Sequence, residues 1–294
     1  MNTDKKGWYR VFNIPKKSGG VRVIEAPIPQ IKTEQRDILD SIMKLYAPSK
    51  FAYGGIIGRN ITMAASQHVA HKYILKVDLS DYFHNVTGDE VKQALMQRKD
   101  INEQAAEFIR FRCTNQDDVL PMGAPTSMFL ANVAAEKMYN AIGKVAENLG
   151  GVFTGYVDDL IISCDNYDNL LKILGLIKKI CQFYKFPINP KKISIMRNKQ
   201  EVLGLCVVND LDHTRLPKKK RYIIKAALHN ARKSLESGKD IPADQWNRLQ
   251  GWVAYSKMAN DQWAEKFRIE YLSLKSLRDQ LKLQHKETSN GKKE

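Results

Sequence analysis

The apolar residues of this 294-residue chain are spaced in two ways. Short apolar runs at 73–77 and 160–162 have the length and branched side chains of buried strands. Other stretches, such as 29–46, repeat apolar residues every three or four positions, the period of an amphipathic helix. Both patterns occur up to about residue 214, and from Leu216 onward the pattern is wholly helical. The sequence therefore predicts an α+β fold with a helical C-terminal region.

Capping residues mark several helix ends. Thr87 is placed to cap a helix that begins at Gly88, and Thr126 or Ser127 to cap a long helix that ends before Gly150. One predicted helix begins at residue 88. The other predicted helices cover residues 29–46, 102–112, 128–148, 166–184, 222–235, 245–258 and 263–283.

Two hairpins are predicted outside the buried runs. Alternating apolar residues on both sides of Gly19 and Gly20 indicate a β-hairpin within residues 8–24. The segments 193–196 and 202–208 are predicted to pair with each other as a second hairpin.

Acidic residues stand where buried strands end. Asp158 and Asp159 lie between two apolar runs, where a tight turn would join them, and Asp78 ends the run 73–77. Carboxylates at such a turn can meet a third carboxylate from a neighbouring strand, and three of them can hold a divalent cation. The alternative is an ordinary solvated turn, because turns favour Asp for their own reasons.

A Pro/Gly loop at residues 120–127 lies between these acidic blocks and runs directly into a predicted helix. The blocks around Asp78, this loop and Tyr156-Val157-Asp158-Asp159 resemble, in this order, motifs A, B and C of reverse transcriptases, in which a Tyr-x-Asp-Asp box marks motif C. The resemblance covers nearly the whole chain and is greatest to bacterial retron reverse transcriptases.

This resemblance implies a right-hand polymerase fold, with fingers, a palm built on an antiparallel sheet, and a helical thumb. On the family pattern, residues 1–70 form the fingers, to which 86–118 return, 71–214 form the palm and 215–285 the thumb. The polar residues 286–294 are expected to be disordered.

The resemblance also implies RNA-directed DNA polymerase activity with two Mg²⁺ ions. Asp78, Asp158 and Asp159 would be the catalytic residues and would ligate the metals, with help from the Leu79 backbone carbonyl. Two such ions serve an in-line displacement at the triphosphate.

The resemblance places the nucleotide-binding residues in several blocks. Arg22 of the first hairpin is the first choice for contacting the triphosphate, and Lys17 or Lys16 is the second; a solvated basic turn is the alternative for the lysines. Phe83 would be the steric gate that rejects a ribose 2′-hydroxyl and so favours dNTPs; an ordinary core aromatic is its alternative. Lys192, in the motif-D block, would reach the leaving pyrophosphate as a cation or proton donor.

Gly123 of the motif-B loop lacks a side chain, so its backbone can approach a nucleotide or template base closely. The chain departs from the family pattern beside it, because Met122 replaces the usual Gln that contacts the nucleotide sugar. Further departures are Ala64 for Asn in a box that retains His68, which we expect to be structural, Met128 for Pro, and Leu203 in the motif-E block.

The net charge of +15 indicates a polyanionic partner. Residues 178–225 carry 13 Lys and Arg against 3 Asp and Glu, which is +10 of that total. Family resemblance places RNA recognition in the thumb segment 218–230, where we expect RNA shape to be read. The nucleic-acid-binding candidates there are Lys218, Lys219, Lys220, Arg221, His229 and Asn230.

The four cysteines and six histidines form no zinc-type pattern, which is typical of a reduced, cytoplasmic protein. No apolar run has membrane-spanning length, and we expect no membrane partner.

The resemblance to retron enzymes implies more specific partners. These are a cognate structured non-coding RNA, part of which is copied into multicopy single-stranded DNA from a guanosine 2′-hydroxyl, and a separate effector protein in anti-phage defence. Three alternatives stay open: a group II intron-like or diversity-generating reverse transcriptase, an RNA-dependent RNA polymerase, and a catalytically silent RNA-binding scaffold. Tyr156 and Phe83 weigh against the RNA polymerase, and the three acids against the scaffold.

Overall fold

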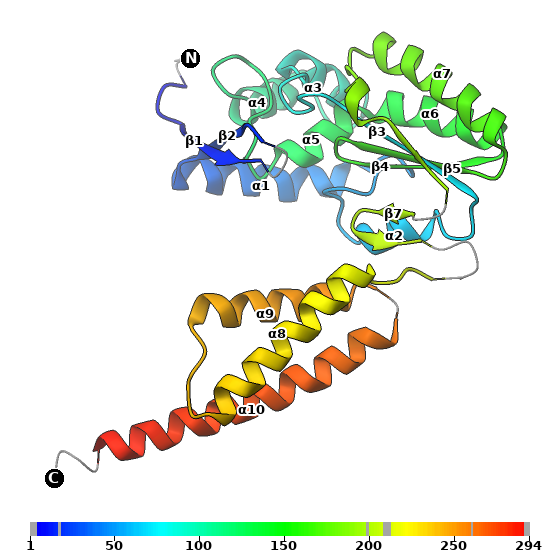
Figure 1. Cartoon of the computed structure of the whole chain (residues 1–294). Helices are drawn as coiled ribbons and strands as arrows, with labels where there is room; N and C mark the ends of the chain where they lie inside the picture. Colours follow the sequence, from blue (N-terminus) through cyan, green and yellow to red (C-terminus); the bar gives the residue numbers. More distant parts are fainter. Residues whose placement is uncertain (1–4, 17–18, 198–199, 208–212, 260, 291–294) are drawn as a thin grey trace. The chain divides into compact units, whose positions relative to one another are not determined.

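The computed structural model describes residues 5–16, 19–197, 200–207, 213–259 and 261–290, with side chains up to residue 284 (Figure 1). The chain divides into two compact units. Unit 1 comprises Met1–Gln67 and Lys72–Arg197, and unit 2 comprises His68–His71 and Asn198–Glu294.

A four-stranded sheet forms the centre of unit 1. Its strands are β3 (Tyr73–Asp78), β4 (Gly151–Tyr156), β5 (Asp159–Cys164) and β6 (Ser194–Met196), in the order β4-β5-β3-β6 with all neighbours antiparallel. The branched residues of the two apolar runs fill these strands, and β5 is buried at every position after Asp159. A fully buried Ile side chain contributes about 1.5–3 kcal/mol, so this burial fixes the position of the strands.

Helices cover the sheet and build the rest of unit 1. Figure 1 shows α6 and α7 side by side along the sheet, and apolar residues of both belong to the main core. The helices of unit 1 are α1 (Pro29–Leu45), α2 (Ile61–Ser66), α3 (Gly88–Leu95), α4 (Glu103–Cys113), α5 (Ser127–Ala134), α6 (Glu136–Asn148), α7 (Tyr167–Phe183) and the 3₁₀ turn η1 (Pro190–Lys192).

The cap predicted at Thr87 is confirmed. Glu90 N donates to Thr87 Oγ1 at 3.2 Å, and Thr87 N donates to the Glu90 carboxylate at 3.0 Å. This reciprocal pair is a capping box, which satisfies two N–H groups that the helix itself leaves unpaired.

The prediction of one long helix over residues 128–148 is wrong, because α5 and α6 are separate helices that meet at Ala135. The predicted cap is wrong as well: Thr126 itself has helical φ and ψ and caps nothing, while Ser127 Oγ donates to Pro121 O at 2.6 Å. The apolar spacing continues on both sides of Ala135, so the hydrophobic pattern does not reveal the break.

The hairpin predicted between 193–196 and 202–208 is also wrong. In unit 1, β6 pairs with β3. In unit 2, β7 (Glu201–Val202) pairs with β8 (Leu205–Cys206) across a turn at Leu203 and Gly204. Both turn residues have positive φ, as a two-residue hairpin turn of this kind requires, and Leu203 adopts it without being a glycine.

The N-terminal hairpin is confirmed. Strand β1 (Tyr9–Pro15) pairs with β2 (Val21–Pro27) in an antiparallel ribbon whose turn end is exposed on both strands. At its base, Trp8 packs edge-on against Phe111 of α4, with ring centroids 5.3 Å apart.

The β4 edge of the central sheet is covered by the segment 51–53. Gly155 N donates to Phe51 O and Tyr53 N donates to Gly155 O, both at 2.8 Å. Gly155 also lies against the Tyr139 ring, where a Cβ atom would come within 2.9 Å of the ring carbons. This residue therefore has to be glycine for the core and the edge to be closed together.

Unit 2 contains a three-helix assembly of α8 (Lys218–Glu236), α9 (Ala243–Ser256) and α10 (Gln262–Asn290). Leu228, Trp246 and Phe267 are among its buried side chains, and Arg278 of α10 bonds Asp240 at 2.6 Å. Residues 286–290, which we expected to be disordered, are helical, and 291–294 lie outside the described residues. No described helix is both long enough and apolar enough to span a bilayer.

His68 is buried, and this burial lowers the pKa of its imidazole to about 3. The ring is therefore uncharged at neutral pH.

Candidate active site

The three predicted acids lie at neighbouring strand ends. Asp78 is the last residue of β3, and its register partner across the ladder is Asp159, the first residue of β5. Tyr156 pairs with Asp159, so Val157 and Asp158 form a two-residue turn, as the sequence predicts. Opposite residues in an antiparallel pair have Cβ atoms about 4.5–5.5 Å apart, which brings the carboxylates of Asp78 and Asp159 together.

Two buried tyrosines, Tyr139 and Tyr82, support the turn at Val157 and Asp158. Tyr139 Oη donates to Val157 O at 2.8 Å and lies 3.0 Å from Tyr82 Oη. Val157 has φ +59°, an unfavourable conformation for a β-branched residue. Sequence reasoning missed both tyrosines, because nothing in the apolar pattern distinguishes them from other core residues.

The carboxylates are partly desolvated and repel one another. Burial is the largest cause that raises the pKa of Asp158, followed by the charge of Asp159. Burial also raises the pKa of Asp159, with Asp78 adding to the effect and Lys76 opposing it. A cation placed among these groups would lower both pKa values and stabilise the ionised forms.

Lys192 supplies a positive charge at this place. Its ammonium group bonds both oxygens of Asp78, at 2.7 and 2.9 Å, and this contact is the main cause that raises the pKa of Lys192. The backbone fixes the same approach, because Asn189 N donates to Asp78 O at 2.8 Å and Asn189 Oδ1 caps η1. Lys192, which is predicted to reach the pyrophosphate, is thus hydrogen-bonded to Asp78, which is a predicted metal ligand.

The donor chemistry fits a hard divalent cation, although the carboxylates are not gathered as a closed ligand set. Three carboxylates at neighbouring strand ends, two with raised pKa values, are the oxygen ligands that Mg²⁺ prefers. Among the described residues, however, no three His, Cys, Asp or Glu side chains are arranged to hold a metal ion. Leu79, the remaining predicted ligand, follows Asp78 and donates its N–H to Asp158 O at 2.9 Å.

The motif-B loop is attached to the ribbon. Glu25 N of β2 donates to Met122 O at 2.8 Å. A Cβ on Gly123 would lie 3.0 Å from Ile24 Cγ2, and the φ of +131° also favours glycine. Packing against β2 therefore already accounts for this glycine, independently of any nucleotide.

The other nucleotide candidates differ in exposure. Arg22 is exposed on β2, three positions before Glu25, and Lys17 lies outside the described residues. Phe83 is half-buried: it packs against the core and its ring centroid lies 5.6 Å from that of Tyr82.

In unit 2, the basic candidates gather at the start of α8. Lys218, Lys219 and Lys220 are exposed there, whereas half-buried Arg221 lies over the Trp263 ring at 5.7 Å. No acidic residue accompanies them in the first turn. Cations at a helix N-terminus oppose the helix dipole, so the dipole does not explain this cluster. Lys218 and Lys220 each lie 5.9 Å from an aromatic ring, that of Tyr222 and that of Tyr255. His229 and Asn230 are exposed further along α8.

The chain belongs to the reverse transcriptase family: residues 14–207 match the family described as reverse transcriptase (RNA-dependent DNA polymerase). Within that family its curated relatives are bacterial retron enzymes, which confirms the resemblance noted in the sequence. Retron Mx65 reverse transcriptase of Myxococcus xanthus is 30% identical over 276 residues, covering 88% of this chain and 63% of the relative.

Two further relatives extend the comparison. Retron Mx162 reverse transcriptase of Myxococcus xanthus is 27% identical, covering 91% of this chain and 61% of the relative. Retron Ec83 reverse transcriptase of Escherichia coli is 27% identical, with 90% and 86% covered. The chain thus spans about three fifths of the length of the two Myxococcus relatives.

Solved structures confirm the right-hand polymerase fold. A telomerase from Candida albicans, solved with a fragment of telomeric RNA, superposes with a TM-score of 0.56 at 10% identity, covering 91% of this chain and 56% of the telomerase. A foamy viral protease-reverse transcriptase, solved with double-stranded DNA, gives 0.52 at 15% identity, covering 93% and 43%. At these identities the likeness concerns the fold alone.

Proposed function

We propose that this chain is the RNA-directed DNA polymerase of a retron. The observation that carries the proposal is the placement of Asp78, Asp158 and Asp159 at adjoining strand ends in a member of the reverse transcriptase family. In this proposal, residues 1–70 and 86–118 serve as fingers, the rest of 71–214 as palm and 215–285 as thumb.

The three acids are the proposed catalytic residues and the ligands of two Mg²⁺ ions, with the Leu79 carbonyl as a further ligand. Reverse transcriptases generally use divalent metal ions. When bound, such ions lower the pKa of the primer hydroxyl and neutralise charge on the triphosphate. The protein's own part is to hold ionised carboxylates together at the strand ends, which the Tyr139–Val157 hydrogen bond supports.

Lys192 serves in the proposal as the group that meets the pyrophosphate. Its ammonium already lies within hydrogen-bond reach of Asp78, and its raised pKa keeps it protonated at neutral pH. Arg22 and Lys17 are the proposed triphosphate contacts from the ribbon, Phe83 the steric gate, and Met122 and Gly123 the loop beside the nucleotide.

The proposed nucleic-acid partners are a cognate structured non-coding RNA and the DNA copied from it. The cations of α8 would bind phosphates, so RNA affinity should fall steeply with salt. We further propose that synthesis starts at a guanosine 2′-hydroxyl and yields multicopy single-stranded DNA, and that the enzyme works in the cytoplasm with a separate effector in anti-phage defence. These features rest on the likeness to retron enzymes.

The testing experiment purifies the protein from cells that carry its own genomic neighbourhood and extracts the bound nucleic acid. RNase, DNase and a debranching enzyme are then applied. A small single-stranded DNA joined through a 2′ branch to RNA is the expected result. An unbranched DNA product would assign the chain to another class of reverse transcriptase. Bound RNA that yields no DNA with Mg²⁺ and dNTPs would instead favour a silent RNA-binding scaffold.

A further inference from the structure

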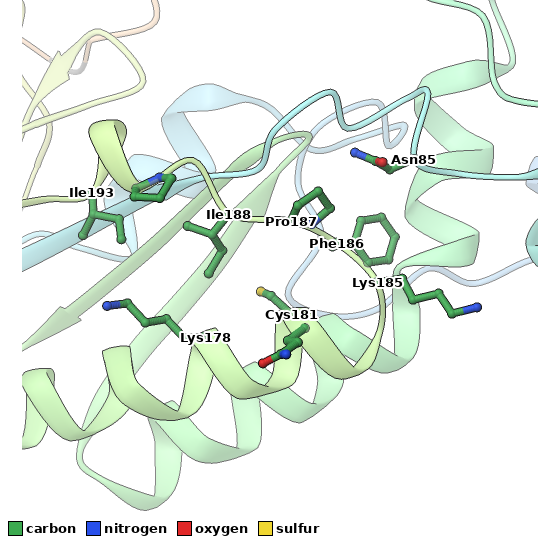
Figure 2. Close-up of a pocket in the computed structure, with 10 residues that line it drawn as sticks. Asn85, Lys178, Cys181, Lys185, Phe186, Pro187, Ile188 and Ile193 are labelled. Atoms are coloured by element: carbon green, nitrogen blue, oxygen red, sulfur yellow. The ribbon is translucent and has the colours of Figure 1, made fainter.

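A pocket of about 570 Å³ lies in unit 1 between the C-terminal part of α7 and the segment that follows it (Figure 2). None of the roles discussed so far uses this pocket. The residues that line it include Lys178, Cys181, Lys185, Phe186, Ile188 and Pro190.

The floor of the pocket is apolar and its rim is cationic. Figure 2 shows Cys181, Phe186 and Ile188 gathered at its centre, with Lys178 and Lys185 on either side of Cys181. Burial raises the pKa of the Cys181 thiol to about 12, so this side chain is uncharged and acts as a small apolar group. In the part of the chain that the structure describes, neither lysine ammonium has an ion-pair or hydrogen-bond partner.

Lys185 occupies a position where glycine would be less strained. It has φ +60° and directly follows the C-cap of α7. Phe186 N donates to Cys181 O at 2.9 Å and Lys185 N to Gln182 O at 3.1 Å, the two bonds of a Schellman motif. Glycine is the usual residue at this place because it has no Cβ. A long cation is therefore retained where helix termination alone favours glycine.

We propose that this pocket binds a small organic anion with a flat apolar body. The apolar body would fill the floor, and the acidic group would pair with Lys178 or Lys185 at the rim. The volume lies within the range of about 300–1,000 Å³ that is typical of small-molecule sites. Lys178 lies in α7 and Lys185 lies just beyond its C-cap, so the two lysines place positive charge on both sides of the apolar floor.

The pocket wall is part of the backbone that holds Asp78. Ser80 N donates to Pro187 O at 2.7 Å, and Asn189 N donates to Asp78 O at 2.8 Å. Pro190, which lines the pocket, is the first residue of η1, and Lys192 is its last. An occupant would therefore restrain the segment that presents Lys192 to Asp78, which makes the pocket a regulatory site for that pair. Only the consequence for DNA synthesis rests on the proposed function.

The test uses the full-length protein and 8-anilinonaphthalene-1-sulfonate, a flat apolar sulfonate, followed by fluorescence titration at moderate salt. The K178E/K185E variant is expected to bind at least tenfold more weakly than the wild type. The K172E/K179E variant is the matched control, because it makes the same charge change on exposed residues of α7 that do not line the pocket. Equal loss in both variants would overturn the proposed site.

The K185G variant separates binding from folding. It removes one ammonium and relieves the positive-φ strain, so its unfolding midpoint should rise while its affinity for the probe falls severalfold. Unchanged affinity in this more stable variant would count against a role for Lys185 in the site. Both measurements are independent of polymerase activity, so their failure is distinct from failure of the proposed function.

Coupling to the active site is read by hydrogen exchange of the full-length protein with and without the probe. The amides of Ser80 and Asn189 should exchange more slowly when the probe is bound, because the wall they bond to is restrained. The same experiment with K178E/K185E should show no slowing. Probe binding to the wild type without any change at these two amides would overturn the regulatory coupling.

Discussion

Two hairpins of unit 1 carry charged residues near their turns, and they are built in opposite ways. The β4–β5 hairpin lies in the central sheet, and its turn is held by hydrogen bonds that Tyr139 donates to Val157 O and Leu79 donates to Asp158 O. The β1–β2 ribbon is a separate two-stranded sheet, and Arg22 near its turn is exposed. One hairpin is fixed by its surroundings, whereas the other meets the rest of the unit mainly at its base.

The difference between the two hairpins corresponds to the sign of the charges that they carry. Carboxylates that repel one another stay close only when packing and hydrogen bonds prevent them from moving apart. In the proposed function, cations that meet a triphosphate from solvent gain from exposed, adjustable side chains. Rigidity therefore accompanies the like-charged acids, and exposure accompanies the cations.

Removing the charges of the fixed hairpin should have the largest effect. The D158N/D159N variant keeps the shape of the turn but loses two anionic oxygen ligands, so template-directed DNA synthesis should fall by about a thousandfold or more. The measurement is primer extension with Mg²⁺ and dNTPs, and a filter-binding assay with RNA is the control, which should be almost unchanged. Near-normal synthesis by this variant would refute the assigned catalytic roles.

The next effect concerns Phe83, which packs beside Tyr82 at the edge of the rigid core. If it is the steric gate, the F83A variant should lose about tenfold or more of its preference for dNTPs over NTPs, because a small side chain admits the 2′-hydroxyl. The ratio of kcat/KM values for dCTP and CTP measures this preference. An unchanged ratio, in a variant that still polymerises, would leave Phe83 as a core aromatic only.

A smaller effect is expected on the exposed ribbon. The R22A variant should raise KM for dNTPs about tenfold, since a charge-assisted hydrogen bond contributes about 1.5–3 kcal/mol. Arg10 is the matched control. Ile14 is the register partner of Arg22, and Arg10 lies four residues before Ile14 on β1. Arg10 is therefore on the same face of the ribbon as Arg22 but farther from the turn. Equal increases in KM for R10A and R22A would indicate a general charge effect.

Lys192 offers a way to weaken one contact of the fixed site. Its ammonium must leave Asp78 before a divalent cation can occupy both oxygens, so the K192Q variant should bind Mn²⁺ about two- to fivefold more tightly, the range given by a solvent-exposed ion pair. Electron paramagnetic resonance of free Mn²⁺ measures the affinity without any turnover. Weaker Mn²⁺ binding by K192Q would show that the lysine supports the site instead of competing for it.

The smallest expected effect is on stability. The folded-state pKa values of Asp158 and Asp159 are raised above the ordinary value of 3.8, so both groups favour folding most below that pH. This contribution is lost as pH rises through the folded-state values. In the metal-free protein, thermal unfolding should therefore show D158N/D159N gaining stability relative to the wild type between about pH 4 and pH 7. A constant difference across this range would contradict the raised pKa values, of which burial is the largest cause and the neighbouring carboxylates a further one.

The sequence was most informative where local chemistry decides the structure. Thr87 with Glu90, the glycines at 19–20 and the acids at 158–159 each produced the predicted cap or turn. These features depend on contacts between residues that are close in sequence, which is why residue type and spacing were sufficient.

Long-range contacts were not predictable in the same way. The pairing of β6 with β3 and the Tyr82–Tyr139 pair join segments far apart in the chain. The Lys192–Asp78 contact spans 114 positions, and family resemblance assigned Lys192 to the pyrophosphate but not to Asp78. An apolar period shows which face of an element is buried without showing what it is buried against.

The covered edge of the central sheet has a consequence for the behaviour of the protein at high concentration. An exposed strand edge offers a row of unpaired amides and carbonyls to which another chain can add, the first step of many aggregates. Gly155 N donates to Phe51 O, and Gly155 O accepts from Tyr53 N, so this part of the β4 edge is not available to a neighbouring molecule. Substituting Gly155 would force the covering segment or Tyr139 outward, and the expected failure is precipitation during expression.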